Sequence, residues 1–378
     1  MIYLDNAATT RPSAAAKAAV LAAMEDFGNP SSVHAMGIAA EKIVTAAREA
    51  IANIIGAKPS EIYFTSGGTE ANNLAILGAA NLHGGAIVTT GAEHPSIVDA
   101  AGEMARRGVE CRHIDHPGGT VATAALVSAI ARPGTLISIH HVNNETGCIQ
   151  DIAALGKAAH SAKAVFHVDA AQSFCKLPID VNTMGIDLLT MSAHKIGGLK
   201  GVGALYVRSG LHVRPMMLGG GQEKSLRGGT ENVVGIGAMG AAAAVEAANM
   251  AENYARALAL KAEFLNGLSA LDGLEINGEN TSPYILNISI KDIRPEVLLN
   301  TLSDFGMYVS AGAACSSNRR QKAAKSAVLL SYGYSQERAA TALRISFGAE
   351  NTPEQMEAAA TLFADCTAKL RQIPRLRG

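Results

Sequence analysis

The regular alternation of short β-rich runs with longer Ala-rich helical stretches constrains the fold of this chain more than any other feature. Strand-then-helix alternation is typical of right-handed β-α-β units, in which helices cover both faces of a mostly parallel sheet. We therefore expect an α/β fold with a mostly parallel central sheet flanked by helices. Buried strands are expected at 61–65, 86–89, 135–140 and 165–168, with helices at 70–80, 96–107 and 152–162.

The pattern changes in the second half of the chain. Two runs, 187–191 and 203–207, lie close together in the sequence and are expected to form a hairpin-like edge of the sheet. After about residue 250 a helix is followed by a strand-like run at 284–290 and then by further helices. The sequence thus predicts two domains: a large α/β domain over 13–250, and a smaller α+β domain over 1–12 and 251–378.

Charge and hydropathy restrict the expected partners. The 378 residues include 32 Lys and Arg against 33 Asp and Glu, a formal net charge of -1, which favours neither nucleic acid nor a membrane surface as a partner. The start, MIYLDNAATT, lacks a basic region followed by an apolar run, so it does not resemble a secretory signal. The Ala-rich stretch 238–251 is interrupted by Glu246. We expect a cytoplasmic protein that binds neither membrane nor nucleic acid directly.

The five cysteines do not indicate a structural site. None belongs to a C-x-x-C pair and their number is odd, so neither a zinc cluster nor a disulfide framework is indicated. Cys111, Cys148, Cys175 and Cys366 are expected to be ordinary small apolar side chains. Cys315 differs because it lies in SAGAACSSN, where the neighbouring side chains are too small to bury its thiol. It is a candidate for a reactive cysteine on a loop.

A glycine-rich motif follows the first expected strand. In open α/β sheets, ligands bind beyond the carboxyl ends of the strands. The sequence SGGTE (66–70) offers Gly67, Gly68 and the hydroxyl of Thr69 at a helix start, an arrangement that suits an anion. It lacks the Gly-Lys-Ser/Thr of a nucleoside-triphosphate loop. Alone, the motif is equally compatible with a simple helix cap.

Titratable residues follow three other strands. Asp169 comes after the strand at 165–168, where a carboxylate is costly unless a cationic group meets it. Lys195, in SAHK, could form a Schiff base if burial lowers its pKa, although an isolated lysine is more commonly a solvated surface residue. His94, in EHP, offers an imidazole at the same edge of the sheet.

Pyridoxal 5'-phosphate would account for these residues together. This cofactor needs a lysine for its aldehyde, an acid for its pyridinium nitrogen and an anion-binding loop for its phosphate. Lys195, Asp169 and the loop around Gly68 would meet those needs, and His94 would cover the ring. Each motif is weak alone, so the combination is what favours the cofactor.

Over essentially its whole length the chain resembles the cysteine desulfurases, which are pyridoxal-phosphate-dependent, class V aminotransferase-like enzymes of fold type I linked to iron–sulfur cluster assembly. No single shared motif is specific, whereas the set is. The motifs are LDNAATT (4–10), GNPSS (28–32), TSGGTEANNLAI (65–76), EH (93–94), HVNNETG (141–147), HVDAAQ (167–172), SAHK (192–195), RGGTEN (227–232), the Cys315 loop and RIS (344–346).

The resemblance implies a role for each matching residue. Asp169 would pair with the ring nitrogen, and Gln172 and Asn144 would lie near the phenolic oxygen. Thr230 would reach the phosphate from the second subunit of an obligate homodimer. Arg344, with Asn144, would bind the substrate carboxylate, which a planar two-donor group suits. The implied cofactor-binding set is Gly68, Thr69, His94, Asn144, Asp169, Gln172, Ser192, His194, Lys195 and Thr230, of which Gly68, Thr69, Ser192 and His194 would hold the phosphate within one chain.

The implied catalytic residues are Lys195, His94 and Cys315. Lys195 would take the Cα proton of the substrate, L-cysteine. Cys315, as a thiolate, would attack the substrate sulfur and keep it as a persulfide while alanine leaves. Because a free thiol is only a few per cent ionised at neutral pH, His94 is a candidate helper for Cys315. The sulfur would then pass to an acceptor protein such as an iron–sulfur scaffold.

Other functions fit parts of the sequence. Residues 235–240, GIGAMG, match G-x-G-x-x-G, but no strand is expected before them, so helix packing is favoured over dinucleotide binding. A sulfur-relay or scaffold protein without turnover is disfavoured because Lys195, Asp169 and Cys315 occur together. A selenocysteine lyase, or a class V aminotransferase that does not need Cys315, are the alternative enzymes.

Overall fold

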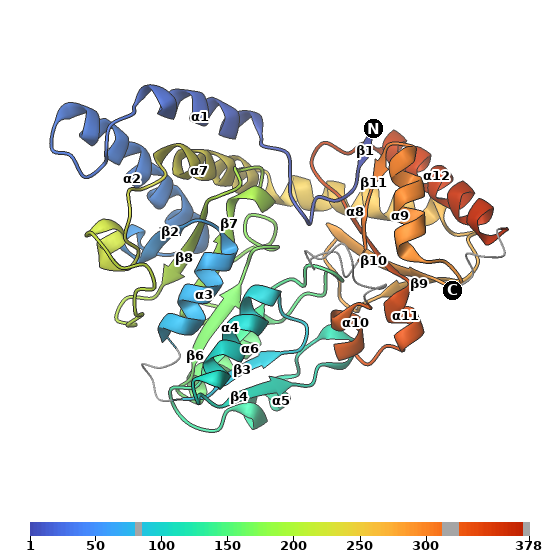
Figure 1. Cartoon of the computed structure of the whole chain (residues 1–378), viewed down its shortest axis with the longest axis horizontal. Helices are drawn as coiled ribbons and strands as arrows, with labels where there is room; N and C mark the ends of the chain where they lie inside the picture. The colour runs from blue at the N-terminus through green and yellow to red at the C-terminus, as the bar shows by residue number, and fades with distance from the viewer. Residues whose placement is uncertain (80–84, 312–324, 373–378) are drawn as a thin grey trace.

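The computed structural model describes residues 1–79, 85–311 and 325–372. The described strands form three sheets, and the two larger ones, each with its own covering helices, lie side by side (Figure 1). We call the seven-stranded one the large sheet and the four-stranded one the small sheet. The two domain boundaries expected from the sequence stay a prediction.

The large sheet is mostly parallel, as expected. Its strands are β2 (Ile62–Thr65), β3 (Ile87–Thr90), β4 (Cys111–Ile114), β5 (Leu136–His140), β6 (Val165–Asp169), β7 (Leu188–Ser192) and β8 (Gly203–Val207). Their order is β2-β8-β7-β6-β5-β3-β4. β8 is antiparallel to β2 and β7, and the other neighbours pair in parallel. The α/β expectation is confirmed.

The expected hairpin-like edge is wrong in its position. β7 and β8 do pair antiparallel, but β8 lies inside the sheet and β2 forms the edge. Gly203 permits this, because a Cβ there would lie 2.7 Å from the backbone of Gly67 at the end of β2. At the opposite edge, β4 has no counterpart in the sequence prediction. Its sequence, CRHI, is polar, and only Ile114 is buried.

Helices cover both faces of the large sheet. Apolar residues alternate between the faces: Leu136 and Leu188 pack with α3 and α4, whereas Ile137 and Leu189 pack with α2, α6 and α7. Strands β5 to β8 are buried at every position, as expected for strands enclosed on both sides. The helices are α1 (Ala14–Glu25), α2 (Ala35–Ile55), α3 (Gly68–Ala79), α4 (Pro95–Arg106), α5 (Thr123–Ala129), α6 (Ile152–Ser161) and α7 (Val233–Ala248), with short 3-10 turns η1 (Pro59–Glu61), η2 (Pro117–Gly119), η3 (Ala193–Lys195) and η4 (Gln222–Ser225).

The G-x-G-x-x-G sequence lies inside α7, which packs against α2 (Figure 1). A Cβ added at Gly237 would lie 2.8 Å from Ile43, and one added at Gly240 would lie 2.7 Å from Ala47. The glycines therefore allow two helices to approach closely. The helix-packing interpretation is confirmed, and the dinucleotide-binding interpretation is wrong because no strand–turn precedes the motif.

The small sheet is antiparallel throughout, in the order β12-β13-β10-β9, and α8 and α12 pack on it. Its core includes Phe264, which meets Phe347 and Phe363 edge-to-face at centroid distances of 6.2 Å and 6.0 Å. The elements are α8 (Met250–Gly267), β9 (Leu274–Asn277), β10 (Ile285–Ile290), α9 (Pro295–Asp304), β12 (Ser310–Ala311), α10 (Ala327–Ser331), α11 (Gln336–Ala340), β13 (Ala342–Ser346) and α12 (Pro353–Arg371), with the parallel pair β1 (Ile2–Tyr3) and β11 (Met307–Tyr308).

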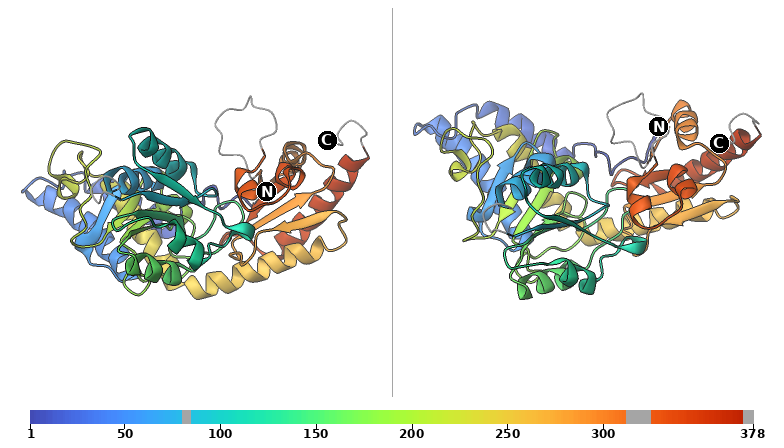
Figure 2. Two further views of the ribbon diagram at one scale, coloured as in Figure 1. Left: turned by 90° about the horizontal axis from the view of Figure 1, so that it is seen from below. Right: turned by 60° about the horizontal axis from the view of Figure 1, so that its bottom comes forward.

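The chain passes between the two sheets at two places. We call residues 4–13 the N-terminal segment; it bridges to the small sheet through Asp5 and Ser346, then reaches the large sheet, where Thr10 N–H donates to the carbonyl of His194 at 2.9 Å. The second passage is the junction of α7 and α8, which meet at 73°. Figure 2 shows α8 running beneath the small sheet. No single helix in the described part of the chain has the length and apolarity to cross a bilayer, and only the bent α7–α8 pair meets that test jointly.

Candidate functional site

Most of the expected site residues gather at one edge of the large sheet. Asp169 ends β6, Ser192 ends β7, and Lys195 ends η3, which follows β7 directly. Gly68 begins α3 just after β2, and His94 caps α4 just after β3. Because these strands point the same way, their carboxyl ends bring the five residues to a common edge.

Asp169 is a buried carboxylate with two neutral donors. Asp169 is only 5% exposed. Oδ1 accepts a hydrogen bond from the N–H of Ala171 at 2.9 Å, and Oδ2 accepts one from the amide of Asn72 at 2.8 Å. Burying a charge is costly unless it is compensated, so this position suits a further, cationic donor.

His94 is fixed by the helix that it begins. It is the N-cap of α4, with Pro95 at the first helical position, and its Nδ1 accepts from the backbone N–H of Ser96 at 3.1 Å. The hydroxyl of Ser96 also lies 2.7 Å from Nδ1. Burial lowers the pKa of His94, as does the nearby Lys195, while Asp169, Asp99 and Glu93 oppose the shift. Asp99 is in α4 itself.

Lys195 contacts the N-terminal segment. Its Nζ donates to the carbonyls of Ala7 at 2.6 Å and Ala8 at 2.9 Å. The amide Nε2 of Gln172 donates to the same Ala7 carbonyl at 2.9 Å. The backbone of residues 7 and 8 therefore places the Lys195 amine and the Gln172 amide next to each other.

The start of α3 forms an anion-binding surface with the end of β7. The first amides of any α-helix have no acceptor within the helix, and the helix dipole favours an anion there. A Cβ added at Gly68 would lie 3.5 Å from the Cβ of Ser192, so the helix start lies against the Ser192 side chain. Thr69 is exposed at the same end of α3.

His194 lies beside the N-terminal segment and is neutral at physiological pH. Its Nδ1 is 3.2 Å from the hydroxyl of Thr9. Burial, with smaller contributions from Lys195, Lys200 and Lys176, lowers the pKa of His194 to about 4. It can therefore contribute a hydrogen bond, rather than a positive charge, to a bound anion.

Arg344 connects the small sheet to the site. It lies in β13 and is 5% exposed; its Nη1 donates to the carbonyl of Asn144 at 2.8 Å, and its Nη2 pairs with Asp5 at 2.9 Å. Its buried Nε has no partner in the described part of the chain. The next residue after Asn144, Glu145, accepts from the Ser326 hydroxyl at 2.6 Å. Burial raises the pKa of Glu145 to about 7, against the opposing effects of Ser326 and Arg344.

The hydrogen bonds described above do not include Thr230. Thr230 is exposed, in a stretch that follows Arg227 and its ion pair with Glu70. Cys315 lies outside the described residues. Of the four cysteines expected to be ordinary, Cys148, Cys175 and Cys366 are buried and Cys111 is partly exposed; none is in a disulfide.

Three contributions to the site were missed by reasoning from the sequence. Asn72 and Ser96 connect Asp169 to His94, and the carbonyls of Ala7 and Ala8 hold the Lys195 amine. Asn72 lies within the motif TSGGTEANNLAI, one helical turn after Gly68. That spacing could have indicated that Asn72 lies on the same face of the helix as Gly68. Backbone carbonyls carry no such signal, because every residue has one.

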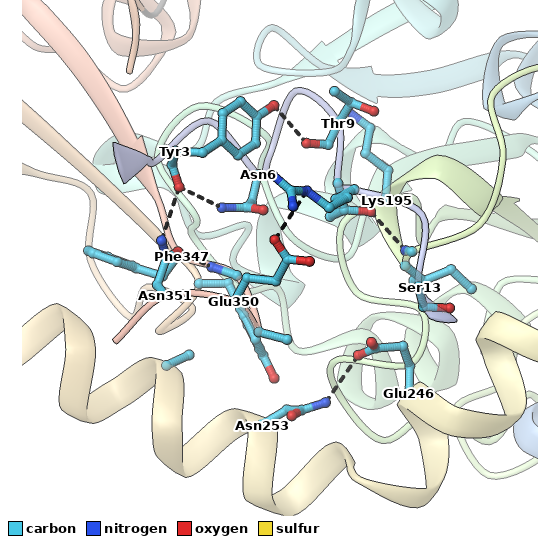
Figure 3. A pocket seen from close by; sticks show the side chains of 18 of the residues that line it. Tyr3, Asn6, Thr9, Ser13, Lys195, Glu246, Asn253, Phe347, Glu350 and Asn351 are labelled. Atoms are coloured by element: carbon cyan, nitrogen blue, oxygen red, sulfur yellow. Dashed lines mark hydrogen bonds and ion pairs between the residues drawn. The ribbon is translucent and has the colours of Figure 1, made fainter. Parts of the chain in front are cut away.

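A cavity of about 600 Å³ opens on the side of Lys195 that faces the N-terminal segment (Figure 3). Its wall includes Tyr3, Thr9, Glu246 and Asn351. Asp169 and His94 are not among the residues that line it. Hydrogen bonds from Tyr3 to the Thr9 carbonyl, 2.9 Å, and from Asn351 to the Tyr3 carbonyl, 3.1 Å, cross-link its rim (Figure 3).

The residues at this edge fit pyridoxal phosphate. Asp169 is a buried carboxylate with no cationic hydrogen-bond partner among the described residues, Lys195 supplies a primary amine, and the start of α3 supplies amides that suit an anion. Gln172 adds a buried Oε1 that has no hydrogen-bond partner in the described part of the chain. Together these residues supply groups for the phosphate, the cationic ring and the aldehyde of such a cofactor.

Comparison with known proteins agrees with this chemistry. The Aminotransferase class-V family matches residues 2–359. The chain is 42% identical to cysteine desulfurase IscS of Tolumonas auensis and 40% identical to that of Pseudomonas aeruginosa, each alignment covering 99% of this chain and 95% of the relative. A solved NifS-like protein superposes with a TM-score of 0.90 at 32% identity, over 98% of this chain and 100% of that one. A structure described as SspA in complex with cysteine gives 0.80 at 34% identity, over 92% and 99%. The chain therefore belongs to the class-V aminotransferase family, as a member of its cysteine desulfurase group.

Proposed function

We propose that this protein is a pyridoxal-phosphate-dependent cysteine desulfurase, which converts L-cysteine to L-alanine and holds the sulfur as a persulfide on Cys315. The observation that carries the proposal is the placement of Asp169 and Lys195 at the ends of the adjacent strands β6 and β7, beside the helix start at Gly68. The homologous desulfurases and the cysteine-bound neighbour support the substrate.

Each part of the cofactor has a proposed partner. Asp169 would face the ring nitrogen, and Gln172 and Asn144 would lie near the phenolic oxygen. The phosphate would rest against Gly68, Thr69, Ser192 and the neutral His194. Lys195 would hold the aldehyde until substrate arrives. Bound there, pyridoxal phosphate supplies an electron sink conjugated to the substrate Cα.

The side chains of the protein then bind substrate and move protons. Arg344 binds the carboxylate of L-cysteine, for which its unpartnered buried Nε provides an additional donor. Lys195 accepts the Cα proton at Nζ, a step that benefits from an amine close to the reacting carbon. The carbonyls of Ala7 and Ala8 keep that amine oriented when it is not bound elsewhere.

Sulfur transfer requires the Cys315 thiolate. Its sulfur forms a bond to the sulfur of the substrate while the carbon–sulfur bond of the substrate breaks. The electron pair of that bond remains with the carbon, which gains a proton and leaves as alanine. Cys315 then carries the persulfide, and no external oxidant is consumed. An acceptor thiol, for example on an iron–sulfur scaffold protein, would receive the outer sulfur.

A homodimer is the proposed assembly, and a cytoplasmic location is proposed with it. Large apolar side chains are exposed beside the Thr230 stretch: the N–H of Gly228 donates to the carbonyl of Met217, and the adjacent Leu218 is 84% exposed. Met216 and Met217, which precede Leu218, are 42% and 45% exposed. Exposed apolar groups of this size favour a protein interface. A second copy covering this surface would enable Thr230 to reach the phosphate of its neighbour.

The decisive experiment measures alanine and sulfide from L-cysteine, with the visible spectrum recorded in parallel. The natural chain should show a coloured cofactor and produce both products. Cys315→Ala should keep the colour and lose both products, whereas Cys111→Ala, a partly exposed cysteine on β4, should retain them. Undiminished turnover in Cys315→Ala would mean that this cysteine is incidental. Running selenocysteine beside cysteine tests the lyase alternative.

A further inference from the structure

The two ring nitrogens of His94 are not equivalent. Nδ1 accepts from the N–H of Ser96 at 3.1 Å, which is the N-cap bond of α4, so a lone pair and not a proton occupies that position. A neutral imidazole carries one N–H, which must then be on Nε2. No partner for Nε2 occurs within the described residues, and His94 is only partly buried, so Nε2 is the edge open to a ligand.

The contacts of Asn72 determine which atoms donate and which accept in the hydrogen bonds around Ser96. Its Nδ2 group donates both protons, one to Asp169 Oδ2 at 2.8 Å and one to Ser96 Oγ at 2.9 Å. A carboxylate only accepts, so the Asn72 amide cannot be flipped without placing its oxygen against Asp169. Ser96 accepts from Asn72 and has one proton left, which it donates to His94 Nδ1 at 2.7 Å.

Protonation of His94 at Nδ1 would break this arrangement. A proton there would face the N–H of Ser96, and the added charge would lie at the N-terminus of α4, where the helix dipole opposes it. The charged groups around the ring are Lys195 after β7, Asp169 at the end of β6, Glu93 after β3 and Asp99 in α4. Burial acts in the same direction as Lys195 and keeps the pKa below its ordinary value.

We infer that Asn72 and Ser96 are positioning residues that hold His94 as the neutral tautomer with its proton on Nε2. His94 then acts as a hydrogen-bond donor toward the reacting groups and not as a general base. A thiolate would be stabilised by accepting from Nε2–H, instead of being formed by proton transfer to the imidazole. The identity of the reacting groups rests on the proposed function, whereas the tautomer is a property of this chain alone.

Nitrogen NMR of the full chain with labelled histidine tests the tautomer directly, first without cofactor and then with pyridoxal phosphate added. The His94 signals are assigned by difference from His94→Gln. We expect the neutral ring to carry its proton on Nε2 and to have an unprotonated, hydrogen-bonded Nδ1, with a protonation midpoint below the ordinary histidine value. A proton on Nδ1 of the neutral ring, or a midpoint at or above the ordinary value, would overturn the inference. The measurement without cofactor separates this outcome from failure of the proposed function, since it requires neither pyridoxal phosphate nor turnover.

Variants of Ser96 test its positioning role. Ser96→Ala keeps the backbone N–H but removes the donor hydroxyl, so the midpoint of His94 protonation should rise by roughly 0.5 to 1 pH unit, the size of one hydrogen bond. Ser96→Thr should restore the original midpoint. Ser161→Ala, an exposed serine at the end of α6, is the matched control and should change nothing. An unchanged midpoint in Ser96→Ala would overturn the role of Ser96, and if that variant does not fold, the signals of the natural chain still decide the tautomer.

Discussion

The two sides of the candidate site are built differently. The Asp169 side comprises Asp169, Asn72, Ser96 and His94, all from elements of the large sheet, and each is hydrogen-bonded to the next. The Lys195 side depends on the N-terminal segment, which also pairs with the small sheet. One side is therefore complete within a single sheet and its helices, whereas the other requires both sheets to be in place.

Arg344 makes this dependence explicit. It belongs to β13 of the small sheet, yet its hydrogen-bond partners are Asp5 in the N-terminal segment and the carbonyl of Asn144, which follows β5 of the large sheet. The cation proposed to bind substrate is thus positioned by three separate parts of the chain. Cofactor orientation and substrate binding should respond differently when the contact between the sheets is perturbed.

The largest effect is expected from Lys195→Ala. It removes the amine on the Lys195 side and should lower alanine production by roughly 100- to 10,000-fold, the usual contribution of an acid–base group, together with the absorption of the cofactor imine. The hydrogen bonds of the Asp169 side should remain, so His94 should keep its proton on Nε2, although its pKa should rise because Lys195 no longer lowers it. Lys157→Ala, exposed on α6, is the control. A normal imine spectrum in Lys195→Ala would contradict the assignment.

An intermediate effect is expected from Arg344. Charge-assisted hydrogen bonds contribute about 1.5–3 kcal/mol, so Arg344→Ala should raise KM for L-cysteine by about 10- to 100-fold. Arg344→Lys keeps the charge but loses the two-donor fork, so its KM should lie between those of the natural chain and Arg344→Ala. Arg112→Lys, on the edge strand β4, serves as the control. If KM in Arg344→Ala stays within twofold of the natural value, Arg344 does not bind the substrate carboxylate.

The smallest effect is expected from Glu145, which lies where the sheets meet. Its folded-state pKa of about 7 is above the ordinary value of 4.5, so the folded chain binds this proton more tightly than the unfolded chain. The stabilisation is complete below about pH 4.5 and is lost as the pH rises through 7, by at most about 3 kcal/mol. Glu145→Gln should flatten that part of the profile.

Urea unfolding of the natural chain and Glu145→Gln, measured from pH 4.5 to 8, checks this expectation. Glu357→Gln, exposed on α12, should reproduce the natural profile. Parallel profiles for the natural chain and Glu145→Gln would show that Glu145 is ionised without cost, and hence that the contact between the sheets is more hydrated than its burial indicates.

Much of the large sheet could be predicted because local patterns determine it. The apolar runs that precede Asp169 and His94 are visible in the sequence, and the parallel arrangement follows from strand–helix alternation. The inner position of β8 could not be predicted, because a strand that pairs antiparallel with β7 can lie either at the edge of the sheet or inside it. β4 was missed since an edge strand needs fewer apolar residues.

The Lys195 side was less accessible to prediction for a different reason. Lys195 and Arg344 were identified by residue type. The Ala7 carbonyl that accepts from Lys195 is 188 residues away, and the Asp5 carboxylate that pairs with Arg344 is 339 residues away. Contacts over such distances depend on the whole fold. Asn72, by contrast, lies one turn into α3 and was missed only because its side chain had no obvious partner.

The two passages of the chain between the sheets have a mechanical consequence. Hydrogen bonds such as that from Arg344 to the Asn144 carbonyl also join the sheets; if they were broken, the two chain connections alone would leave a single rotational freedom, about the line through those points. Here the points are the N-terminal segment and the bend between α7 and α8. Lys195 is bonded to the first of them, so it lies near the axis and would shift little in such a rotation, whereas groups farther along the small sheet would sweep through longer arcs.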